Sequence, residues 1–134
     1  YQTSPGGTLP SSNQNLSTPL GQYNMAFRYF TGDGVLQDYK EAAQWLRKAA
    51  VQGHPAAQYN LGIMYSQGQG VAQDPDEAYF WLKVSSISGY DMSKDKTDFV
   101  ALAASQLSRP SRAAIEKRAK EWKPAITAAA KGSL

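Results

Sequence analysis

The sequence contains no cysteine and a single histidine, His54. Without cysteine the chain has no disulfide bond, no thiolate metal site and no cysteine nucleophile. His54 stands just before Pro55 at an expected turn, where a lone histidine is more often structural or solvent-facing than a general base or a metal ligand. We therefore expect no cofactor, no bound metal and no enzymatic activity.

Long apolar runs are also missing, and none approaches the ~20 residues of a membrane helix, so no membrane insertion is expected. Residues 1–18 carry no charged side chain and few aliphatic ones, and they cannot bury enough surface to offset their chain entropy. We predict a flexible polar tail or linker there and a second tail over residues 125–134. Because the first residue is Tyr1, we expect that a preceding segment was removed or that the chain comes from a longer one.

The feature that determines the fold is an internal repeat with an offset of 36 residues. Gln22-Tyr23-Asn24 recurs as Gln58-Tyr59-Asn60, and the same offset relates two Gly-x-Gly-Val turns and two Trp-Leu pairs. The register holds without a gap until about Tyr90. It predicts one repeat domain over residues 19–124, with repeats at about 19–54 and 55–90 and a cap at 91–124.

The sequence pattern of each repeat is typical of two successive helices. In the second repeat, Leu61 and Tyr65 share one face of a first helix, which ends at a glycine-rich turn. Asp74 can cap a second helix, with a glutamate three residues on in a capping-box-like pattern. Gly62 lies inside the first helix at a cost of ~1 kcal/mol relative to alanine, so we expect a neighbouring helix to approach closely there.

After Tyr90 the repeat register fades, and two closing helices are predicted. The first is expected from about Lys94 to Leu107, with Phe99, Leu102, Ala103 and Leu107 facing inward. Ser108 is expected to cap the second, whose buried face carries Ile115, Ala119 and Trp122. A stack of two repeats is small, so this helix pair is expected to act as the third unit and cap the solenoid.

Three motifs carry a resemblance to a known family. They are A-Q-Y-N-L-G-x-x-Y at 57–65, G-x-G-V at 68–71 and D-x-x-E-A-x-x-W-L at 74–82, and the first repeat shows the same pattern. The chain resembles the Sel1-like repeat family, a relative of the tetratricopeptide repeats. The resemblance implies an all-α solenoid of antiparallel helix pairs that acts as a scaffold or adaptor. It also implies a concave surface, formed largely by the first helix of each repeat, that binds a protein or peptide.

The resemblance further implies a bacterial envelope system, a periplasmic or otherwise exported location with a cytoplasmic one as the alternative, and association with peptidoglycan or another envelope component as one choice of partner. The residues that the repeat motif leaves free on the first helices are the candidate partner-binding residues. It is equally expected that the aromatic and aliphatic side chains among these residues pack between helices instead of binding a partner. The candidates are Asn24, Phe27, Arg28, Asn60, Ile63, Met64 and Gln67.

The charges are unevenly placed and leave two other functions open. Residues 1–93 carry 5 basic and 7 acidic side chains, whereas residues 94–134 carry 9 basic and 4 acidic ones. A basic closing helix could bind nucleic acid or an anionic glycan, although a solvated helix face is the more common reason for such a pattern and nucleic acid is an unlikely partner. An immunity-type inhibitor of a secreted effector enzyme is the other alternative. The paired carboxylates at 38/41 and 74/77 are better explained as helix caps than as acid–base groups.

Overall fold

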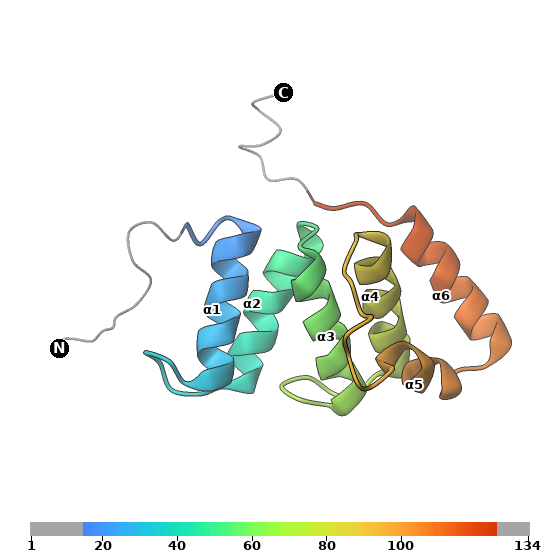
Figure 1. Ribbon diagram of the computed structural model, residues 1–134, viewed down its shortest axis with the longest axis horizontal. Coiled ribbons are helices and arrows are strands. Elements are labelled where there is room, and N and C mark those ends of the chain that lie inside the picture. The colour runs from blue at the N-terminus through green and yellow to red at the C-terminus, as the bar shows by residue number, and fades with distance from the viewer. Residues whose placement is uncertain (1–14, 126–134) are drawn as a thin grey trace, which may run out of the picture.

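The computed structural model describes residues 15–125, so residues 1–14 of the predicted tail at 1–18 and residues 126–134 of the predicted tail at 125–134 lie outside the described residues. Within that range the chain forms six helices and no strand. The helices are α1 (Pro19–Thr31), α2 (Tyr39–Val51), α3 (Pro55–Gln67), α4 (Pro75–Ile87), α5 (Phe99–Ser105) and α6 (Arg109–Glu121). They follow one another along the long axis, with α1 at one end and α6 at the other (Figure 1). The all-α repeat fold is confirmed.

Helices α2 and α4 begin with the same aspartate cap. Asp38 accepts hydrogen bonds from the backbone N–H groups two and three residues ahead, and Asp74 does the same. The N–H of each aspartate donates to the carbonyl of a tyrosine in the preceding helix, Tyr29 at 2.9 Å and Tyr65 at 3.0 Å. That N–H is the one that a capping-box glutamate would take. The cap therefore also fixes the two helices of a repeat to each other.

Helices α3 and α4 approach each other closely at Gly62. A Cβ atom at Gly62 would lie 2.8 Å from Cγ of Leu82 and 3.2 Å from the carbonyl oxygen of Ala78. The expectation that a neighbouring helix passes close to this glycine is confirmed. Leu82 and Leu61 are fully buried around it, so this contact lies at the centre of the core.

The helices pack as a stack, each against the next. Helix α1 packs on α2, α2 on α3 and α3 on α4, while both α5 and α6 pack on α4. The buried residues of the four repeat helices join in one apolar cluster, and α5 and α6 add Ala103, Ile115 and Ala119 to it. The closing pair thus covers the second repeat, as the third unit of a stack would.

The first closing helix differs from the prediction. It begins at Phe99, not near Lys94, and spans only 7 residues. The residues before it are polar and turn back on themselves, since the N–H of Asp95 donates to the carbonyl of Met92 at 3.1 Å. Asp98 then caps the helix by accepting from the N–H of Ala101. The predicted inward position of Leu102 is also wrong, because this side chain is 44% exposed.

The predicted cap of α6 is confirmed, because the Ser108 hydroxyl accepts from the N–H of Ser111. After α6 the chain turns back over the stack, towards α2 (Figure 1). We call residues 122–125 the return segment. Its Ala125 N–H donates to the carbonyl of Val51 at the end of α2, at 2.7 Å. The segment therefore joins the cap to the first repeat. At the other end, residues 15–18 form a turn, and Gln22 donates to the carbonyl of Leu16 at 2.9 Å, so these four belong to the folded domain.

Candidate partner-binding surface

The candidate binding residues lie on α1 and α3, the first helices of the two repeats. Phe27 is 55% exposed and Gln67 is exposed. Asn24, Asn60 and Ile63 are half-buried. These five side chains are accessible, at least in part, and two of them, Phe27 and Asn60, line one hollow between α1 and α3. Leu20, on the same helix as Phe27, is 61% exposed and was not among the predicted binding residues.

Of the other two candidates, one is buried. Met64 is only 1% exposed and belongs to the core, so its prediction as a surface residue is wrong. Arg28 stands at the same repeat position, 36 residues earlier, and is half-buried. Helix α3 packs on both α2 and α4, whereas α1 is the end of the described stack. The same repeat position is buried in α3 as methionine and half-buried in α1 as arginine.

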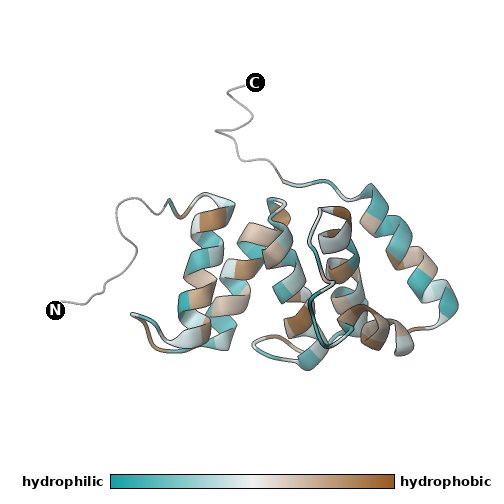
Figure 2. Ribbon diagram, viewed as in Figure 1, coloured by the Kyte–Doolittle hydropathy of each residue, from teal (hydrophilic) through white to brown (hydrophobic). Residues whose placement is uncertain are grey.

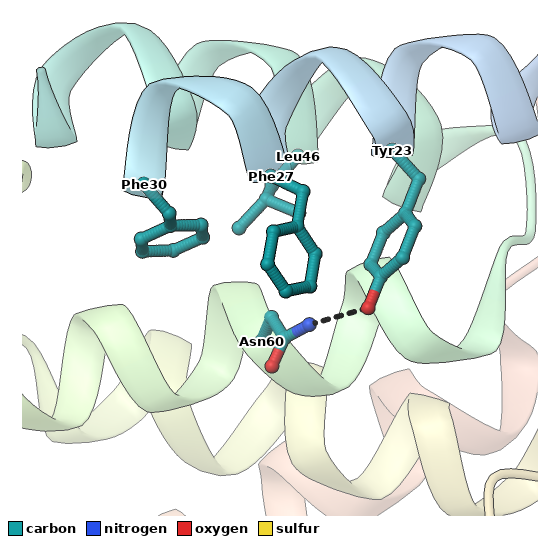
Figure 3. Close-up of a pocket in the computed structure, with 5 residues that line it drawn as sticks. All are labelled: Tyr23, Phe27, Phe30, Leu46 and Asn60. Carbon is teal, nitrogen blue, oxygen red and sulfur yellow. Dashed lines mark hydrogen bonds between the residues drawn. The ribbon is translucent and has the colours of Figure 1, made fainter. Parts of the chain in front are cut away.

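A groove lies between α1 and α3. It has a volume of about 240 Å³. Three aromatic side chains of α1 form its wall, and one residue each from α2 and α3 completes it (Figure 3). Its lining residues are Tyr23, Phe27, Phe30, Leu46 and Asn60. We call this hollow the α1–α3 groove. Phe27 and Asn60 were predicted from the sequence, whereas the other three residues were not.

The polar end of the groove is held by a chain of contacts. The side-chain amide of Asn60 donates to the hydroxyl of Tyr23 at 3.2 Å. The Tyr23 ring stacks on His54, with ring centroids 4.7 Å apart. Nδ1 of His54 accepts from the N–H of Ala57 at 3.1 Å and so caps α3. Burial lowers the pKa of His54 below its usual 6.5, which keeps Nδ1 free to accept this bond.

The second repeat has an equivalent tyrosine in a fuller environment. Tyr59 stacks on Tyr90 at 4.4 Å, which repeats the Tyr23–His54 pair, and it also meets the edge of Phe99 at 6.4 Å. Burial and a hydrogen bond to the carboxylate of Asp95 raise the pKa of Tyr59. Tyr59 is only 4% exposed. The chain itself thus surrounds the tyrosine of the second repeat, while that of the first faces the α1–α3 groove.

The charges of this face are few. Helix α3 carries no charged side chain, and α1 carries one, Arg28. The groove is therefore suited to apolar and hydrogen-bonding partners, not to phosphates or polyanions. This uncharged surface contrasts with α6, much of which is hydrophilic (Figure 2).

Two of the cationic side chains of α6 have structural contacts. Arg112 donates to the carbonyls of Ala104 and Leu107, at 3.3 and 3.4 Å, and so closes the end of α5. The guanidinium of Arg118 lies 4.6 Å from the ring centre of Phe80. These contacts give the helix a role in docking the cap, which weakens the argument for an anion-binding surface.

Within residues 15–125 no group of three or more histidine, aspartate or glutamate side chains is arranged to hold a metal ion. The carboxylates of Asp38 and Asp74 accept backbone hydrogen bonds as helix caps. His54 caps a helix too. Each of these three titratable residues thus has a structural role as a helix N-cap. None of the described helices has the length and apolarity to cross a membrane.

Comparison with known proteins shows which family the repeats match. The Sel1 repeat family model matches residues 19–54 and 55–90, the same two units that the sequence register predicts. A crystal structure of a protective antigen from uropathogenic Escherichia coli strains, which displays an SLR fold, is 30% identical with a TM-score of 0.67, and the match covers 79% of this chain and 23% of that one. A crystal structure of a Sel1 repeat protein from Oxalobacter formigenes is 37% identical with a TM-score of 0.56, over 69% of this chain and 25% of that one. A search of curated proteins gave no significant match. The chain thus spans about a quarter of the length of each of these two proteins.

Proposed function

Because this chain belongs to the Sel1 repeat family, whose repeats generally mediate protein–protein interaction and are typically non-enzymatic scaffolds, we propose that it is a scaffold or adaptor that binds a protein or peptide through the face of α1 and α3. The observation that carries the proposal is the α1–α3 groove, with Phe27 55% exposed at its wall. Exposed aromatic side chains beside a hollow are typical of interaction sites, because they bury a large area on binding.

Photo-crosslinking in lysate of the source organism tests this proposal. We would place p-benzoylphenylalanine at Phe27 and, as the matched control, at Ile87 of α4. The two side chains are 55% and 58% exposed, so collision with abundant proteins should affect both equally. We expect a protein to be captured from position 27 and not from position 87, and to be lost from a Phe27→Ala pull-down. Equal capture at both positions would contradict the proposal.

Salt separates this function from the basic-module alternative. With one charged side chain on α1 and none on α3, partner binding should change by less than about twofold between 50 and 200 mM salt. Binding of nucleic acid through α6 would instead weaken by orders of magnitude over that range. The measurement is the dissociation constant, at both salt concentrations, of the non-covalent complex between the unmodified protein and the partner that crosslinking identifies.

We also propose that this interaction takes place in a bacterial cell envelope, in the periplasm or at another exported site. The support is similarity to two bacterial proteins, one of them described as a protective antigen. Cell fractionation of the full-length tagged protein tests the location, and recovery with the cytoplasmic fraction would contradict it. Capture of one secreted enzyme as a tight partner would identify the immunity-type inhibitor instead of an adaptor.

A further inference from the structure

We infer that the α1–α3 groove binds an extended peptide segment of the partner, with one bulky apolar side chain in the groove and the adjoining peptide group hydrogen-bonded to Tyr23 and Asn60. The inference rests on the proposed function and specifies the chemistry of the partner. Three observations support it: the size of the groove, the hydrogen-bonding groups at its end, and the environment of the equivalent tyrosine in the second repeat.

The groove has the size and character of a side-chain pocket. Its volume of about 240 Å³ exceeds the ~150 Å³ of apolar cavities that hold benzene, so one leucine, phenylalanine or tryptophan side chain has room in it. Phe27, Phe30 and Leu46 supply an apolar surface. Phe27 stands edge-on to Tyr23, with ring centroids 6.5 Å apart, and an incoming ring or branched chain can pack on its free side (Figure 3).

The end of the groove offers one donor and one acceptor side by side. Tyr23 accepts from the Asn60 amide and retains its own hydroxyl hydrogen, while Asn60 retains its carbonyl oxygen. Within residues 15–125 neither the hydroxyl hydrogen of Tyr23 nor the side-chain carbonyl oxygen of Asn60 has a hydrogen-bond partner. A peptide group needs one acceptor for its N–H and one donor for its C=O. The Tyr23–Asn60 pair provides both.

The second repeat shows what the fold places against the same tyrosine. Around Tyr59, the segment from Tyr90 to Phe99 contributes a stacked ring, a ring edge and the carboxylate of Asp95; burial and the interaction of this carboxylate with the tyrosine hydroxyl raise the pKa of Tyr59. No residue of this segment before Phe99 is helical. In the first repeat, His54 replaces the stacked ring, but the acceptor for the hydroxyl of Tyr23 is missing from the described chain. A partner segment supplies it.

An extended segment fits these groups better than a helix. The backbone groups in the body of a helix are already hydrogen-bonded to one another, so they could not satisfy Tyr23 and Asn60. An extended chain presents free N–H and C=O groups beside each side chain, as in other modes of strand-like peptide recognition. The absence of charge on α3 also means that the apolar side chain, and not an ion pair, supplies most of the affinity.

Selection from a random dodecapeptide library displayed on phage tests the inference. We expect the enriched peptides to share one leucine, phenylalanine or tryptophan. For a synthetic peptide of the enriched sequence, we expect Phe27→Ala to weaken binding more than tenfold and Tyr23→Phe to weaken it about fivefold. Ile87→Ala, at a similarly exposed position, should leave it unchanged. N-methylation of the amide next to the apolar residue should weaken it about as much as Tyr23→Phe does.

Three results would overturn the inference: no enriched sequence, an enriched peptide insensitive to both groove variants, or a bound peptide that is helical by NMR chemical shifts. Circular dichroism checks that each variant stays folded, and Tyr23→Phe retains the ring that stacks on His54. If position 27 crosslinks a folded protein while no peptide is enriched, the interaction function stands and the extended-peptide inference fails. If neither experiment finds a partner, both fail.

Discussion

One repeat position, occupied by residue 26 in the first repeat and residue 62 in the second, shows how the side chain differs where two helices pack together. Both residues lie in the first helix of a repeat and are buried. Ala26 is fully buried, whereas Gly62 has room for no Cβ because Leu82 lies 2.8 Å from where it would stand. The lower helix propensity of glycine is offset here by the close approach of α3 and α4.

Gly62→Ala is therefore expected to destabilise the protein by about 1 kcal/mol, although alanine is the better helix former. The overpacking cost of about 1–3 kcal/mol, less the gain of ~1 kcal/mol in helix propensity, leaves a net loss of up to about 2 kcal/mol. Urea denaturation measures the difference. Gly62→Ala combined with Leu82→Val is the control, because shortening Leu82 should recover part of the loss. An increase in stability for the single variant would show that α4 can move away freely.

His54 gives the protein a dependence on pH near neutrality. Its neutral Nδ1 caps α3, and burial lowers its pKa below 6.5. The unfolded state therefore binds the proton more readily than the folded state. Stability is complete above pH ~6.5 and is lost as the pH falls through that value towards the folded pKa.

We expect the free energy of unfolding to fall between pH 7.5 and pH 5.5, and this fall to vanish in His54→Asn. Asparagine caps helices well and does not titrate in this range. The pKa of Glu116 is lowered from 4.5, and that of Asp91 is also lowered, so both act below the chosen window. Urea denaturation at the two pH values measures the effect. An equal fall in wild type and variant would assign it to another group.

At the scale of helices, most of the fold could be predicted because its signals are local. Caps, helix-ending glycines and the 36-residue register define α1 to α4. Helix α5 could not be bounded, because the register fades there and the Asp98 cap sets a later start than apolar spacing suggests.

The binding surface was less predictable. A motif shows which positions are free, but only stacking shows which of them remain exposed, hence the error at Met64. Phe30 and Leu46 were not predicted as groove residues because they lie on different helices, and only the packing of α1 on α2 brings them to the same hollow. One signal was present in the sequence: Phe30 stands where the second repeat has Ser66.

The docking of α6 is tested by Trp122→Ala. This half-buried ring meets Trp81 edge-on, with centroids 5.9 Å apart. Because it is not fully enclosed, the expected loss of about 2–3 kcal/mol lies at or below the lower end of large-to-small core changes. Lys123→Ala, at an exposed neighbour, is the control and should cost less than about 0.5 kcal/mol. A loss below about 1 kcal/mol for Trp122→Ala, measured in urea, would show that α6 is not docked.

At the scale of the whole molecule, the return segment changes the character of the stack. In a simple repeat array each unit contacts only its neighbours, so the ends can open independently. Here Ala125 bonds to Val51, which joins the chain after the last helix to the end of the first repeat. Pro124 also lies beside Gly53, 3.3 Å from where a Cβ atom of that glycine would stand.

Ala125→Pro tests this connection, because proline has no N–H to donate to Val51. We expect a loss of about 1 kcal/mol, the usual net value of a hydrogen bond, and a broader urea transition as the first repeat separates from the cap. Ala125→Ser keeps the N–H and is the control. Coincident transitions by tryptophan fluorescence and circular dichroism in both variants would contradict the coupling.

The return segment also has a consequence for how the protein is made. Synthesis proceeds from the N-terminus, so both repeats leave the ribosome before the residues that connect them to the cap. Until Ala125 emerges, the carbonyl of Val51 lacks its donor and Trp81 lacks the ring of Trp122. Until then, the two helix pairs of the repeats lack these contacts, and the nascent chain must keep its structure without them.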